Sequence, residues 1–248
     1  MLSGTSRPRS GPMEAIRTRP RPKAWALNFY SSAVGKKAVM AVTGIILLGF
    51  VLAHMIGNLK LYTGADHMNE YGAYLREIGE PILPHTGALW ILRGVLILSF
   101  ALHIHAAASL TLMNKRARPE GYKGGRHYVA ANYAARTMRW SGIIVGAFVL
   151  FHLMDLTWGT ANPDFEHGQP YQNVVASFQR EPVALVYIIA NLLLGMHIFH
   201  GAWSLFQSLG WNHPRFNPWR KAFAYAFAAV IVIGNVSFPI AVMTGIVE

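Results

Sequence analysis

Six histidines lie inside long apolar stretches of this chain, where polar side chains are costly and usually functional. They are His54, His103, His105, His152, His197 and His200. Imidazole is a common metal ligand, and two helices that each offer one histidine suit a haem iron held between two imidazoles. Taken singly, each histidine is explained equally well as a bundle residue that hydrogen-bonds a backbone carbonyl.

The elements that position these histidines are five apolar stretches, each long enough to cross a bilayer. We place them at residues 38–60, 88–113, 140–160, 183–209 and 222–246. The 248 residues are 53% hydrophobic and 13% charged, a composition typical of a membrane protein. The predicted fold is therefore all-α, an integral membrane bundle of five transmembrane helices. Because the chain has no cysteine, it cannot form disulfides, thiolate-only Fe–S clusters or c-type haem attachments by itself.

Charge alternates from loop to loop. Residues 1–37 and the second and fourth loops carry most lysines and arginines, whereas the first and third loops are mainly acidic. This is the positive-inside pattern, and it predicts a cytoplasmic N-terminus and an outside C-terminus. The net charge of +11 follows from topology, and we expect no nucleic-acid partner.

The chain divides into a basic tail and a membrane domain. Residues 1–27 are rich in Arg, Pro and Ser, which predicts a disordered cytoplasmic tail, and residues 28–248 form the five-helix domain. We expect a short interfacial segment at 28–32 and short helices in the outer loops near 68–78 and 172–180. The sequence shows no convincing internal repeat.

The histidines fall at matched depths along the predicted spans. Counted from the basic ends, His54 and His152 lie about 20–24 Å up their helices, and His103 and His197 about 13–18 Å. Two facing histidines at one height suit a planar macrocycle, so the sequence offers two stacked sites. His105 points about 200° away from His103, whereas His200 lies one turn from His197 on the same face. Either neighbour could be the ligand, or could bind a propionate or line a quinone pocket.

Arg93 and Asp155 lie near the outer ends of the second and third spans. Arg93 could bind a haem propionate. A plain Arg93–Asp155 ion pair, or an Arg93 side chain that snorkels to the membrane interface, explains the pattern equally well.

A family resemblance rests on short motifs spread over residues 28–245. They are Thr43-Gly44, HMIGNL at 54–59, Leu102-His103, Leu110-Thr111, NKRARP at 114–119, Phe151-His152, HIFHGAWS at 197–204 and QSLG at 207–210. Together they resemble the cytochrome b membrane anchor subunit of succinate dehydrogenase, and more closely the single-chain, five-helix bacterial type.

The resemblance implies a subunit of succinate:quinone oxidoreductase in the bacterial inner membrane, with the dicarboxylate active site on another subunit. The partners it implies are a flavoprotein and an iron–sulfur subunit on the cytoplasmic side, membrane lipid, quinone and possible further copies of the complex. The cofactors it implies are two b haems. His54 with His152 would hold the haem distal to the iron–sulfur subunit, and His103 with His197 the proximal haem.

Alternatives remain open at this point. A haem-free anchor could use its histidines for quinone or for a [2Fe–2S] cluster completed by two cysteines of a partner. For quinone binding, Ser31, Ser32 and Lys36 are the inner candidates, and Glu70 and Glu77 with Arg93 the outer ones. A transporter that relays protons or binds a metal is a different class of function, but we would expect it to have central carboxylates, which these spans lack.

Overall fold

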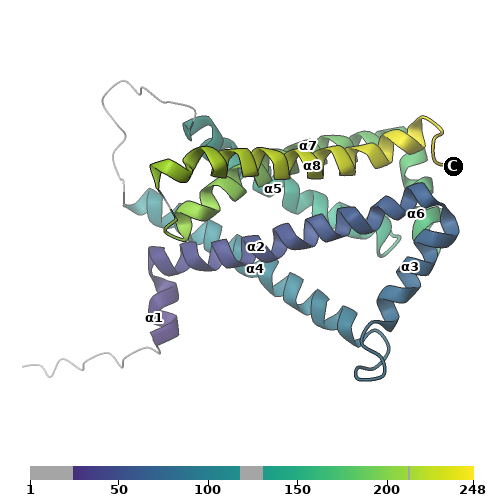
Figure 1. The fold of residues 1–248 in the computed structure, drawn as a ribbon, viewed down its shortest axis with the longest axis horizontal. Coiled ribbons are helices and arrows are strands. Elements are labelled where there is room, and N and C mark those ends of the chain that lie inside the picture. Colours follow the sequence, from purple (N-terminus) through teal and green to yellow (C-terminus); the bar gives the residue numbers. More distant parts are fainter. Residues whose placement is uncertain (1–24, 118–130, 212) are drawn as a thin grey trace, which may run out of the picture.

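The computed structural model describes residues 25–117, 131–211 and 213–248, and this part of the chain is all helical (Figure 1). The elements are α1 (Trp25–Ser31), α2 (Ala33–Asn58), η1 (Leu59–Thr63), α3 (Ala65–Glu77), α4 (Gly87–Arg116), α5 (Ala131–Leu156), α6 (Pro170–Gln179), α7 (Glu181–Ser208), η2 (Pro214–Phe216) and α8 (Asn217–Met243). The predicted tail falls outside the described residues up to position 24, and α1 begins at Trp25.

Five helices are long and apolar enough to cross a membrane, as predicted. They are α2, α4, α5, α7 and α8, and the short helices expected in the outer loops are α3 and α6. The predicted ends differ from the observed ones by a few residues. The third span stops at Leu156 rather than 160, shortly before Gly159 turns the chain with a φ of 75°. The fifth begins at Asn217 because Pro218 suits the first turn of a helix.

The helices form two similar units. In each unit, a long helix leads through a short outer helix to a second long helix, as α2–α3–α4 and as α5–α6–α7. Within each unit the long helices pack together, and the units join where α2 packs on α7. Helix α8 packs along α7. Helices α2 and α4 diverge, so that the N-terminal end of α4 lies away from α2 (Figure 1).

Amide side chains join the two units at the end of the bundle that carries α3 and α6. Asn69 of α3 donates from Nδ2 to the side-chain oxygens of Gln169 and Gln172, and its Oδ1 accepts from the backbone N–H of Tyr171. A buried apolar cluster draws residues from α2, η1, α3, α6, α7 and α8. The short helices are therefore packed into the same core as the long ones.

Candidate functional site

His54 of α2 and His152 of α5 meet as the depth argument predicts. Their ring centroids are 5.8 Å apart, and their planes cross at 77°. Phe50 and Phe148, each one turn earlier on the same helix, lie against these rings, at 5.4 Å from His54 and 6.0 Å from His152. Two helices from different units thus present one imidazole each between aromatic side chains.

His103 of α4 and His197 of α7 each contact a hydroxyl side chain on the first long helix of the same unit. Thr43 Oγ1 of α2 lies 3.2 Å from His103 Nδ1, and Ser141 Oγ of α5 lies 3.2 Å from His197 Nδ1. The contact between α4 and α7 is not among the main helix contacts of the described structure.

Hydroxyl groups on α2 and α5 favour one protonated ring nitrogen in His103 and His197. Thr43 donates its only hydroxyl proton to backbone oxygens, at 2.7 Å from Val39 O, and Ser141 likewise donates to Met138 O at 3.1 Å. With its proton placed there, each hydroxyl oxygen can accept from the Nδ1–H of its histidine. A neutral ring with Nδ1 protonated has its lone pair on Nε2, which is the form that binds a metal.

His152 also has a hydroxyl oxygen beside Nδ1, and this hydroxyl donates its own proton to a carboxylate. Tyr187 OH lies 3.3 Å from His152 Nδ1 and donates its proton to Asp155 Oδ2 at 2.8 Å, so its oxygen accepts from the ring. The fourth histidine, His54, has Asn58 Nδ2 at 3.2 Å from Nδ1. An amide turned by 180° would present its oxygen there and protect the same tautomer.

Pairs of histidines, with no further ligand side chain beside them in the described structure, fit a metal whose other ligands come from a bound cofactor. No group of three or more His, Cys, Asp or Glu side chains that could hold a metal ion occurs among the described residues. A haem iron needs only one or two axial ligands from the protein. None of the four histidines is fully enclosed by the chain, and a Cβ built on Gly49 or Gly146, in the helices of His54 and His152, would meet no atom of a neighbouring element within 4 Å. Paired imidazoles beside open space therefore suit a macrocycle.

The two units repeat a sequence segment that sequence analysis missed. Residues 43–54 read TGIILLGFVLAH, and residues 141–152 read SGIIVGAFVLFH, with seven of twelve positions identical. Each copy begins with a hydroxyl residue and a glycine, and both lie against the histidine on the second long helix of the same unit, His103 or His197. Each copy also carries a phenylalanine and ends with its own histidine, His54 or His152. Aligning the two spans on His54 and His152 would have revealed Thr43 and Ser141 from sequence alone.

The neighbouring histidines have other surroundings. His105 Nδ1 lies 2.5 Å from Tyr30 OH, so it faces α1 whereas His103 faces α2. The predicted divergence of these two side chains is thus observed. His200 lies beside Phe199, with ring centroids 5.1 Å apart.

The ion pair considered between Arg93 and Asp155 is wrong. Asp155 pairs with Arg180, whose Nη2 lies 2.5 Å from Oδ1, because Arg180 follows α6 directly above the end of α5. Arg93 is exposed on α4 and lies over the Trp90 ring at 5.0 Å. Its charge is therefore available to another group.

The inner quinone candidates all contact the backbone of the α1–α2 corner. Ser31 Oγ donates to Asn28 O, and Ser32 Oγ donates to Phe29 O while it caps α2. The buried Lys36 donates to Tyr30 O and Ser31 O. Two of its three protons are used in this way, which leaves one.

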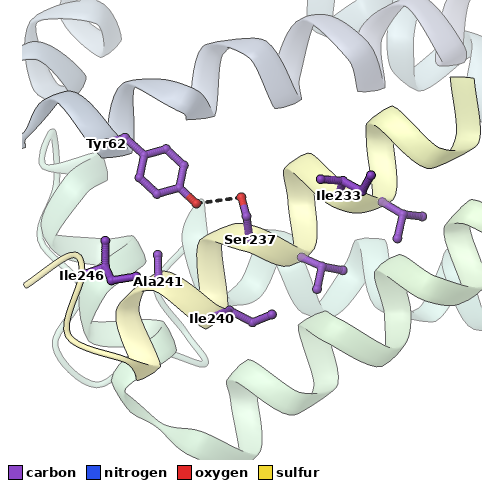
Figure 2. A pocket seen from close by; sticks show the side chains of 8 residues that line it. Tyr62, Ile233, Ser237, Ile240, Ala241 and Ile246 are labelled. Carbon is purple, nitrogen blue, oxygen red and sulfur yellow. Dashed lines mark hydrogen bonds between the residues drawn. The ribbon is translucent and has the colours of Figure 1, made fainter. Parts of the chain in front are cut away.

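A groove of about 430 Å³ lies elsewhere, along α8 and η1 (Figure 2). Its lining is apolar except for Tyr62 and Ser237, whose hydroxyls are joined by a hydrogen bond of 2.7 Å. None of the six histidines lines it. It is separate from the candidate site.

Residues 130–236 match the family model of the succinate dehydrogenase/fumarate reductase transmembrane subunit. The match spans α5, α6, α7 and most of α8, and it includes His152, His197 and His200. No curated protein and no solved structure matches the chain significantly. The family match supports the resemblance drawn from the motifs, and its description covers succinate dehydrogenase and fumarate reductase together.

Proposed function

We propose that this chain is the membrane anchor of a succinate:quinone oxidoreductase and that it holds two b haems. His54 and His152 would bind the outer haem, and His103 and His197 the inner one. The observation that carries this proposal is the hydrogen bonding at Nδ1. Beside three of these histidines, a side-chain oxygen that gives its own proton elsewhere lies within 3.3 Å of Nδ1, and this supports Nε2 as the ligand atom.

The repeated segment extends the argument to the half of the chain outside the family match. The match begins at residue 130, yet α2 carries the same hydroxyl, glycine, phenylalanine and histidine as α5. Two units built alike would each contribute one ligand to each haem. We therefore propose the same ligand role for His54 and His103 as for their counterparts.

Bound haems would supply one-electron carriers at two depths of the membrane. The residues of this chain would orient the ligand rings, exclude bulk water and set the electron-donating strength of each imidazole. Arg93, which has no partner carboxylate in the described structure, would be free to bind a propionate. The dicarboxylate chemistry would take place on a partner flavoprotein.

We propose that the flavoprotein and iron–sulfur subunits dock at the cytoplasmic end, in the inner membrane of a bacterium. Lys36 and Lys37 begin α2, Lys115 and Arg116 end α4, and Lys221 lies in the first turns of α8, so these cations share one end of the bundle. The positive-inside rule assigns that end to the cytoplasm.

Quinone reduction is proposed at the same end, near the docked iron–sulfur subunit. A quinone oxygen needs a donor, and the hydroxyl protons of Ser31 and Ser32 are already given to the α1 backbone. Lys36 keeps one N–H after its two backbone contacts. Of these three residues, Lys36 is therefore the proposed donor.

A reduced-minus-oxidised visible spectrum of the purified complex, with a pyridine haemochrome count per copy of this chain, tests the proposal. The expected result is two b haems. His54→Ala or His152→Ala should then abolish one haem and spare the other. A complex without haem would refute the cofactor assignment. Low-temperature EPR would then decide whether a [2Fe–2S] cluster with histidine ligands takes its place.

A further inference from the structure

A buried polar cluster lies directly behind His152. Asp155, one turn later on α5, is fully buried, as is Ser177 of α6, and Tyr187 of α7 is 4% exposed. Asp155 accepts from Arg180 through Oδ1 and from Ser177 and Tyr187 through Oδ2. A buried carboxylate near the outer end of a membrane span is costly unless it is paired in this way.

The direction of the hydrogen bonds runs from the histidine toward the carboxylate. The Tyr187 proton is given to Asp155, so the phenol oxygen turns its lone pairs to His152 Nδ1, 3.3 Å away. A phenol that donates to a carboxylate is a better acceptor, because hydrogen bonds in a chain polarise one another. His152 thus donates into a chain that ends on a negative charge.

We propose that Tyr187 is a positioning residue for the outer redox centre. Together with Asp155, it fixes the Nδ1-protonated form of His152 and strengthens Nε2 as an electron donor to the metal. This inference rests on the proposed function, since it assumes a metal bound at His152. A stronger donor stabilises the oxidised metal and so lowers the reduction potential of the centre.

Holding the fold together does not by itself require the Tyr187 hydroxyl. Asp155 has two further partners in Arg180 and Ser177, and the Tyr187 ring packs on Phe148, Phe151 and Phe178 whether or not it carries the hydroxyl. The other unit also lacks this chain of groups.

In the repeat alignment, the counterpart of Asp155 in α2 is Gly57, so His54 has no carboxylate at the equivalent position. Instead, His54 has the amide of Asn58 beside it. The Tyr187–Asp155 hydrogen bonds would therefore act on one histidine ligand of the outer centre and on none of the inner centre.

The test compares Tyr187→Phe with Tyr62→Phe in the intact complex. Tyr62 is a matched control, because its hydroxyl also bonds a side chain near the outer end of the bundle, in the groove shown in Figure 2, but contacts no histidine. Midpoint potentials are measured by spectroelectrochemical titration. The signal that His152→Ala abolishes identifies the outer centre.

Tyr187→Phe should favour reduction of the outer centre about tenfold, a rise of about 59 mV for a one-electron couple, and should leave the inner centre unchanged. Tyr62→Phe should shift neither centre. Two wild-type centres with no shift in Tyr187→Phe would overturn this inference and leave the proposed function standing. A wild-type complex without a redox centre in this chain would instead refute the proposed function.

Ser177→Ala is a second variant, and it should shift the potential of the outer centre in the opposite direction. It tests the inference by itself if the Tyr187→Phe complex does not assemble. Without the Ser177 hydroxyl, the Asp155 carboxylate pulls harder on the Tyr187 proton, and His152 becomes a stronger donor. The outer potential should fall. An unchanged or raised potential would overturn the inference.

Discussion

Removing the hydroxyl at the start of either repeated segment should loosen the inner haem. Thr43→Val and Ser141→Ala each delete the side-chain acceptor for one Nδ1–H, leave the backbone oxygen of Met40 or Met138 beside the ring, and change little else in shape. The hydroxyls also donate to helix carbonyls, but those oxygens already accept within the helix. The loss therefore falls on the histidine.

The size of the effect follows from burial. Thr43 is 5% exposed and Ser141 is 4% exposed, so water cannot readily replace either hydroxyl. One intramolecular hydrogen bond contributes about 0.5–1.5 kcal/mol net. At about 1.4 kcal/mol per tenfold, haem affinity should fall by about 2- to 12-fold in each variant.

The assay is the rate of haem transfer from the purified complex to excess apomyoglobin, followed separately at the wavelengths of the two haems. Thr111→Val is the control, because Thr111 donates to Ala107 O in the same way but contacts no histidine. We expect faster release of the inner haem in both variants and wild-type release in the control. Equal release from all four proteins would refute the assignment of these hydroxyls to His103 and His197.

Three further outcomes follow from the contacts. His103→Ala should reduce haem content more than His105→Ala, since His105 contacts α1; a larger loss in the second variant would reverse the ligand choice. Arg180→Met should lower the stability of the detergent-solubilised complex by about 3–5 kcal/mol in thermal or denaturant unfolding, because it strands the buried Asp155 carboxylate, and an unchanged midpoint would contradict this. A cysteine introduced at the exposed Glu77, in a chain with no other cysteine, should react with an impermeant reagent only from outside, and labelling from the cytoplasmic side would overturn the topology.

The sequence alone determined the number of spans, the helical class and the level of the histidines. Membrane thickness demands about 20 apolar residues for each crossing, and the rise of a helix converts residue count into depth. For this reason His54 and His152 could be paired from sequence, and the structure brings their rings to 5.8 Å. The divergence of His103 and His105 followed from helix geometry in the same way.

Tertiary structure alone decided which side chains lie behind the ligands. The sequence suggested Arg93 as a partner for Asp155, and only the packing of α6 against α5 shows that the partner is Arg180. The same holds for Tyr187, which is 35 residues from the histidine it touches. Hydrogen bonds reach about 3 Å and depend on direction, so they require the packing of helices that a one-dimensional pattern does not contain.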